Sequence, residues 1–183
     1  MKTIHALATA TLFMFTPVLV LHAQTSAIDR GSVLLDGDAS FTSNTAGVNN
    51  DDRMTLLTVR PAVQYLILPG FAIGGVVSLA HSSLNGLSST AFGVGPAVTY
   101  FFGKGERNFY PFVSGHLNLD RVIYSGDQDA RNVFSYRGAG GVLLMLSRSV
   151  GLTGELFYRG QNSRGNSNSN SFGLAFGVSA FIF

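Results

Sequence analysis

The amino-acid sequence predicts an all-β fold, an eight-stranded antiparallel up-and-down transmembrane β-barrel that follows an N-terminal signal peptide. The first observation is that eight segments alternate apolar residues with small or polar ones, which is the period of a β-strand. The second is that the connections between them alternate between short turns and longer polar stretches. The third is composition, because 12% of the 183 residues are charged, 22 are Gly and 15 are Phe, with neither Cys nor Trp. Strands that face lipid on one side and a crowded interior on the other have this composition.

The N-terminus has the pattern of a secretory signal peptide over residues 1–23. An uncharged apolar run, Ala6–Leu21, precedes the small residue Ala23, which predicts cleavage after Ala23, with Ala27 as a second candidate. A proline interrupts the run, which is also shorter than the roughly 20 residues of a membrane-spanning helix. We therefore expect a cleaved signal peptide rather than an anchor, and a barrel domain over residues 24–183.

Each of the eight segments carries aliphatic and aromatic residues on one face and small or polar residues on the other. We assign the first face to lipid and the second to the barrel interior. Val63 and Val98 fall on outward faces, and glycines such as Gly93 and Gly95 on inward ones, where a small barrel is crowded. In the last segment both faces are apolar or small, so the pattern leaves its outward face open. The segments are Gly31–Thr42, Thr55–Leu68, Phe71–Ser82, Thr90–Phe102, Asn108–Val122, Asn132–Leu146, Val150–Gly160 and Ser171–Phe183.

The connections between the segments differ in length at the two ends of the predicted barrel. Three are tight turns built from Pro, Gly and Ser, with the sequences "LPG", "GKGER" and "SRSVG". Short turns at one end and long loops at the other are the layout of an outer-membrane barrel, with periplasmic turns and extracellular loops. The four longer, polar connections are residues 43–52, 83–89, 125–131 and 161–170.

The chain ends on "SFGLAFGVSAFIF", whose last three residues are Phe181, Ile182 and Phe183. The whole predicted barrel, and this ending most of all, resembles the small eight-stranded outer-membrane β-barrel proteins, also described as the porin family. The resemblance implies a location in the bacterial outer membrane. It also implies that Phe181, Ile182 and Phe183 are the signal by which the outer-membrane assembly machinery recognises the chain, and that the last strand closes the barrel against the first. The chain departs from the family pattern at Gly177 and Ser179, which share the parity of the final aromatic residue.

Seven charged or titratable residues have the inward parity, and we predict that they form a lumen charge network. Eight strands enclose a space just wide enough for side chains to fill, so inward charges need partners. Counting outward from the middle of the first loop puts Asp36 opposite Arg60, and the same count in the third loop brings His116 close to Arg137. We expect His116 to be neutral and Glu155 to pair with the arginines on its side. The network comprises Asp36, Asp38, Arg60, His116, Arg137, Glu155 and Arg159.

His81 and Ser83 share one face of the third segment, and their spacing resembles that of outer-membrane lipid A deacylases, in which a His activates a Ser. A nucleophilic serine needs a base that a carboxylate orients. Glu106 lies in a turn at the opposite end and Glu155 faces the interior, so we interpret His81 as part of the interfacial girdle. The two aspartates of "GDQD" supply too few oxygens for calcium. The sequence therefore predicts no catalytic residues, no metal site and no cofactor.

The predicted function is that of an integral outer-membrane protein of structural or interaction type rather than an enzyme. Its exposed loops are a candidate binding or adhesion surface for an extracellular ligand, because loops on a rigid scaffold commonly carry binding sites. The other expected partner is outer-membrane lipid. Scattered arginines and a formal net charge of +2 give no footprint for nucleic acid. Two alternatives remain, a lipid-modifying enzyme that uses His81 and Ser83, and a narrow pore.

Overall fold

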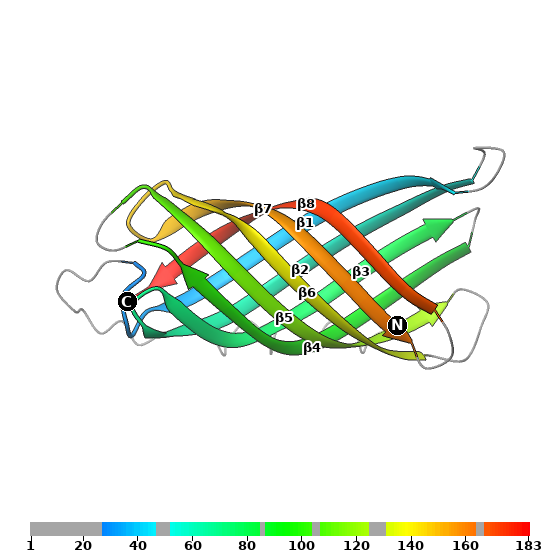
Figure 1. Cartoon of the computed structure of the whole chain (residues 1–183), viewed down its shortest axis with the longest axis horizontal. Coiled ribbons are helices and arrows are strands. Elements are labelled where there is room, and N and C mark those ends of the chain that lie inside the picture. The colour runs from blue at the N-terminus through cyan, green and yellow to red at the C-terminus, as the bar shows by residue number, and fades with distance from the viewer. Residues whose placement is uncertain (1–26, 47–51, 85–86, 104–106, 125–130, 164–166) are drawn as a thin grey trace, which may run out of the picture.

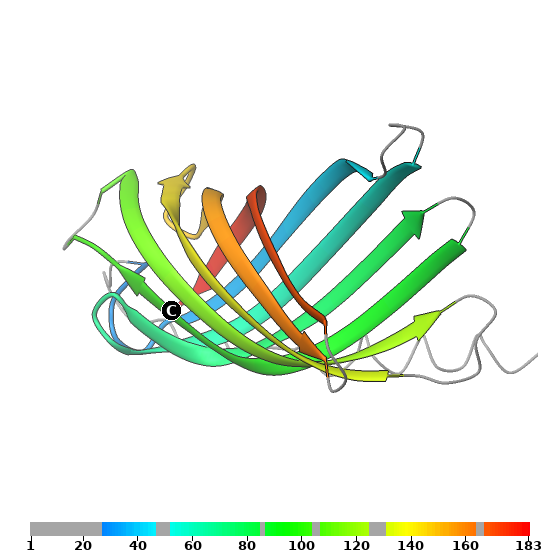
Figure 2. The ribbon, with the colours of Figure 1, turned by 45° about the vertical axis from the view of Figure 1, so that its right-hand side comes forward.

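The computed structural model describes residues 27–46, 52–84, 87–103, 107–124, 131–163 and 167–183. They form one closed barrel in which each strand pairs antiparallel with its sequence neighbours and β8 pairs with β1 (Figure 1). The strands cross the barrel obliquely and coil around it (Figure 2). The predicted eight-stranded up-and-down barrel is confirmed. The strands are β1 (Val33–Ala46), β2 (Asp52–Leu68), β3 (Phe71–Leu84), β4 (Leu87–Phe101), β5 (Phe109–Tyr124), β6 (Arg131–Met145), β7 (Val150–Ser163) and β8 (Ser167–Ile182).

The strands continue into the polar stretches that we expected to be long loops. The β1–β2 ladder runs up to the pair Ala46 and Asp52, and the β7–β8 ladder up to Ser163 and Ser167. The expectation of four long loops was therefore wrong in its boundaries. Antiparallel pairing uses the backbone alone, and strand ends that meet water on both faces need no apolar alternation. The residues between the paired strands, 47–51, 85–86, 125–130 and 164–166, lie outside the described residues.

The opposite end of the barrel carries the short turns and both described ends of the chain (Figure 1). Between β2 and β3, Gly70 has a φ of 78°, a conformation that glycine adopts without strain. The Gly70 amide donates to the Ile28 carbonyl over 2.8 Å, and the Phe101 amide donates to the Gly70 carbonyl over 2.8 Å. The Phe181 amide donates to the Ser149 carbonyl over 2.8 Å. The first two bonds tie the segment before β1 and the end of β4 to the β2–β3 turn, and the third ties the end of β8 to the β6–β7 turn.

The outer wall of the barrel is an apolar belt. Its members are the aliphatic and aromatic residues that the alternation assigned to lipid, such as Val63 and Val98, which are 48% and 44% exposed. The strands have 14 to 17 residues, whereas a tilted transmembrane strand needs about 9 to 11, so each can cross a bilayer and extend beyond it. Among the described residues no helix is long and apolar enough to cross a membrane.

The structure settles the outward face of β8, which the sequence pattern left open. Phe172, Leu174, Phe176 and Val178 point outward and are more than half exposed, whereas Ser179 is buried. The crowded interior explains this choice of face. A Cβ on the inward Gly177 would lie against the Gly37 carbonyl and the Thr153 hydroxyl, so no larger residue fits at this inward position.

A layer of buried apolar side chains fills the barrel at the turn end. Each strand that contributes does so from inward positions at its turn-side end, and Ile28 joins from the segment before β1. Phe101 and Phe181 meet in this layer with their ring centroids 6.1 Å apart. We call this layer the apolar floor. It comprises Ala27, Ile28, Leu34, Leu66, Ala72, Phe101, Tyr110, Phe112, Leu143 and Phe181.

Candidate functional site

The barrel lumen above the apolar floor contains three arginines and three carboxylates that are each at most 9% exposed. Buried charges are costly unless they are paired and hydrogen-bonded. Every one of these arginines forms an ion pair with one of the carboxylates. The pairs are Arg60 with Asp38, Arg137 with Glu155, and Arg159 with Asp120.

The first pair joins directly opposed residues of β1 and β2. Arg60 donates from Nε to Oδ2 of Asp38 over 3.1 Å and from Nη2 to Oδ1. The predicted pairing of Arg60 with Asp36 was wrong, because Asp36 lies opposite Ala62. A hairpin centred one residue later than expected moves each partner by two positions, which keeps every side chain on its face. Asp36 instead accepts a 2.7 Å hydrogen bond from Ser179, across the seam where β8 closes the barrel on β1.

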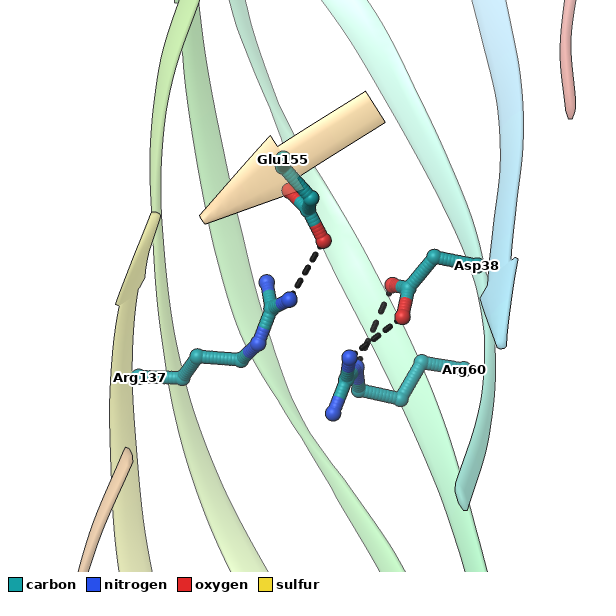
Figure 3. A network of polar contacts seen from close by, with 4 residues as sticks. All are labelled: Asp38, Arg60, Arg137 and Glu155. Atoms are coloured by element: carbon teal, nitrogen blue, oxygen red, sulfur yellow. Dashed lines mark hydrogen bonds and ion pairs between the residues drawn. The ribbon is translucent and has the colours of Figure 1, made fainter. Parts of the chain in front are cut away.

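The second pair approaches the first from another side of the lumen (Figure 3). Arg137 on β6 donates from Nη2 to Oε1 of Glu155 on β7. The guanidinium carbons of Arg137 and Arg60 lie 4.5 Å and 5.3 Å from the centroid of the same ring, that of Phe157. An aromatic face attracts cations, so Phe157 lets two like charges share the middle of the barrel. Phe157 is a member of the site that we had not predicted.

The third pair centres on Asp120, a second residue missing from the predicted network. Asp120 accepts hydrogen bonds from Ser78 on β3 over 2.8 Å, from Ser135 on β6 over 2.5 Å and from Arg159 on β7 over 3.0 Å. Gly93 on the intervening β4 makes this possible, because a Cβ there would overlap the carboxylate of Asp120 and the hydroxyl of Ser78. The inward parity of Asp120 and the inward glycine beside it were the available sequence signals.

Several buried polar atoms of the lumen have no protein partner among the described residues. His116 lies directly opposite Arg137 on the neighbouring strand, as the loop count predicts, but its Nδ1 is unpartnered. So are Nε and Nη1 of Arg137 and both amide atoms of Gln64. Buried groups of this kind are commonly satisfied by ordered water. Isolated water molecules between the buried charge pairs can therefore satisfy these atoms.

His81 and Ser83 share the outward face near the loop end of β3, so the structure places them together on the lipid-facing wall. Nδ1 of His81 lies 3.2 Å from the hydroxyl of Thr90 on β4. In the described part of the chain no carboxylate hydrogen-bonds to His81. Glu155 is occupied in the lumen, and Glu106 lies outside the described residues. The orienting acid of a catalytic triad is thus missing from the described wall.

The remaining predicted sites divide between the apolar floor and the undescribed segments. Phe181 packs in the floor, Ile182 pairs with Val33 in the closing seam, and Phe183 follows at the rim. The predicted signal peptide, residues 1–23, and the "GDQD" segment lie outside the described residues. Within the described ranges no three His, Asp or Glu side chains gather as metal ligands.

Comparison with known proteins addresses the fold. No protein-family model and no curated protein matches the chain. Neisserial surface protein A is 16% identical, with 83% of this chain covering 96% of that chain at a TM-score of 0.60. OprG from Pseudomonas aeruginosa is 10% identical, with coverages of 84% and 96% and a TM-score of 0.53. The N-terminal β-barrel domain of OprF from Pseudomonas aeruginosa is 14% identical, with coverages of 83% and 98% and a TM-score of 0.51.

The chain has the fold of the small eight-stranded outer-membrane β-barrels. The apolar belt is the lipid-facing surface that this fold requires, and the short turns mark the periplasmic end. We therefore expect the opposite end, with the outward His81 and the extended strand ends, to face out of the cell. At 10 to 16% identity these likenesses concern the fold, so the function has to be argued from the barrel itself.

Proposed function

We propose that this outer-membrane barrel acts as a structural or interaction protein whose lumen is closed and whose working surface is its loop end. The observation that carries the proposal is the filling of the lumen. An apolar floor occupies the turn end, and above it three buried ion pairs reach across the interior from β1, β2, β5, β6 and β7. A solute path would have to pass both layers.

A conductance measurement tests the closed lumen. Wild-type protein in planar bilayers should pass little ion current. A barrel in which Arg60 and Asp38 are both replaced by Ala should conduct more than the wild type, because one of the three buried charge pairs is then removed. Stable single-channel conductance in the wild type that is insensitive to these two replacements would show an open pore and overturn the proposal.

The candidate binding surface is formed by the strand ends beyond the apolar belt. Pairing continues there to Ala46 and Asp52 on one side and to Ser163 and Ser167 on the other. Such extensions are rigid platforms, and binding segments are commonly presented on rigid scaffolds. Adhesion to an extracellular ligand therefore belongs to this end of the molecule.

Hairpin truncation tests the working surface. Gln161 and Ser169 are directly paired, so residues 162–168 can be replaced by an Asn-Gly turn without changing the register below. The matched control replaces residues 123–130 by the same Asn-Gly turn between Val122 and Arg131, which are also paired. Both variants should fold. Capture of a ligand from whole cells that is lost with one truncation and kept with the other would identify the binding hairpin; capture that survives truncation of every hairpin would contradict the proposal.

The enzymatic alternative is tested at His81 and Ser83. We expect Ser83→Ala and His81→Ala to leave the acylation of lipid A unchanged, because no carboxylate contacts His81 in the described wall. Mass spectrometry of lipid A from cells that express each variant measures this directly. A change in acylation between wild type and either variant would favour a lipid-modifying enzyme.

A further inference from the structure

A band of polar side chains crosses the outward face of four neighbouring strands at the upper edge of the apolar belt. His81 on β3 is paired with Thr90 on β4, and Arg121 on β5 is paired with Asn132 on β6. All four residues are exposed. On β3, β4 and β6 the band lies just beyond the last outward apolar residue of each strand, and on β5 one outward apolar residue, Ile123, follows Arg121. We call these four residues the polar band.

Arg121 is the cation of the polar band, and its surroundings are those of a membrane interface. Its outward neighbours on β5, Leu119 and Ile123, are 68% and 55% exposed. Among the strand side chains that the structure describes, no carboxylate forms an ion pair with Arg121, whereas each buried arginine has one. A lipid-facing cation is least costly at the interface, where head groups can neutralise it. The wall therefore presents a positive charge that calls for an anion from the membrane.

We propose that the polar band binds the phosphate of a phosphorylated glycolipid in the outer leaflet. The guanidinium fork matches the geometry of a phosphate and binds it with two parallel hydrogen bonds. The hydroxyl of Thr90 and the amide of Asn132 lie on either side of Arg121 and can donate to the remaining phosphate or sugar oxygens. The exposed Phe92 and Leu119 below the band contact the acyl chains of the same lipid. His81 then serves as a head-group contact rather than as a base.

The inference rests on the outer-membrane orientation of the barrel, with the loop end outward. The opposite rim supplies a matched control, because Arg148 is also exposed but lies in the β6–β7 turn instead of on a strand wall. If general charge attraction were responsible for lipid binding, Arg148 and Arg121 would contribute alike.

Calorimetric titration of the folded, full-length barrel in a neutral detergent tests the proposal. The titrants are bisphosphorylated lipid A, the same lipid A with its phosphates removed, and inorganic phosphate. We expect dephosphorylation to weaken binding about tenfold or more, and Arg121→Gln to weaken binding of the phosphorylated lipid about tenfold. Arg121→Lys should fall between Gln and wild type, and Arg148→Gln should bind as the wild type does.

Three results would overturn the assignment. One is equal binding of lipid A with and without phosphates, and another is an Arg121→Gln variant that binds like the wild type. The third is displacement of lipid A by inorganic phosphate at equal concentration, which would indicate a site for the free ion. An unboiled gel band at the wild-type position shows that each variant is folded. Failure of the outer-membrane location would appear separately, in cell fractionation, so the two failures are distinguishable.

Discussion

At the scale of single residues, the lumen shows how a barrel of this size carries charge without a channel. Asp120 collects three donors from β3, β6 and β7, and Asp38 receives two hydrogen bonds from Arg60. The Asp38 arrangement lies on the neighbouring strands β1 and β2, whereas Asp120 on β5 reaches across β4 to Ser78 and across β6 to Arg159. Each charge is thus satisfied by side chains that are distant in the sequence.

Breaking the Arg60–Asp38 pair should be costly. Arg60→Ala leaves a buried carboxylate without its partner, which typically costs about 3 to 5 kcal/mol. The combined Arg60→Ala and Asp38→Ala variant should lose less than the sum of the single variants, because no charge is then stranded. Urea unfolding in lipid vesicles, followed by the fraction of folded gel band, gives the free energies. Arg148→Ala at the exposed turn is the control and should change little; strictly additive losses would contradict the pairing.

Gly93 should not tolerate a methyl group. A Cβ at this position would overlap the carboxylate of Asp120 and the hydroxyl of Ser78, so we expect Gly93→Ala to destabilise the barrel by about 1 to 3 kcal/mol. Gly138 offers a matched control, since nothing lies within 4 Å of a Cβ built there. Gly138→Ala should be neutral or slightly stabilising. Equal effects of the two substitutions in the same unfolding assay would show that the Asp120 cluster is not tightly packed.

At the scale of elements, each strand has two faces with opposite requirements. One face needs apolar side chains toward lipid, and the other needs side chains that fit the crowded lumen. Ala97 and Val98 are consecutive residues of β4, yet Ala97 is 2% exposed in the lumen and Val98 is 44% exposed on the belt. β8 shows the same division over residues 171–179, where the inward side consists of Ser, Gly and Ala and the outward side of Phe, Leu and Val. Crowding on one side and lipid on the other select these residues.

Arginine substitutions at two neighbouring positions of β4 should fail for different reasons. Val98→Arg places a charge against lipid and should cost about 2 to 4 kcal/mol at mid-membrane depth. Ala97→Arg puts a long side chain into a filled lumen, so we expect overpacking and loss of the folded band. Refolding into bilayers of short-chain and long-chain lipid separates the two, because only the Val98→Arg penalty depends on membrane thickness. A thickness-dependent penalty at Ala97 instead would mean that the faces of β4 are reversed.

At the scale of the whole molecule, the barrel is closed in two senses. β8 pairs with β1 from Val33 and Ile182 up to Ala39 and Phe176, which closes the sheet toward the turn end, and the apolar floor closes the turn end of the lumen. In the described part of the chain, the surfaces that can meet lipid or a ligand are therefore the outer wall and the strand ends beyond it. The two proposed binding sites, at the loop end and at the polar band, therefore both lie on the outside of the barrel.

A closed barrel should resist detergent. We expect unboiled protein to migrate differently from boiled protein on a gel, and to stay with the outer-membrane fraction after alkaline carbonate extraction. Cells that express the full chain, with Edman sequencing of the mature N-terminus, test the predicted cleavage after Ala23 in the same preparation. A protein that is released by carbonate or found in the soluble periplasm would contradict the membrane barrel.

The eight strands, their faces and the tight turns could be predicted from the sequence, because lipid on one side and a filled interior on the other impose a strict period of two. Inward placement of Arg60, Arg137, Glu155 and Arg159 followed from parity alone. Which carboxylate meets which arginine did not. A slip of two residues between neighbouring strands preserves every face, so alternation cannot distinguish Asp36 from Asp38 as the partner of Arg60. Asp120 and Phe157 also contact side chains on strands that are not their neighbours. Those side chains come together only when the sheet curls into a barrel.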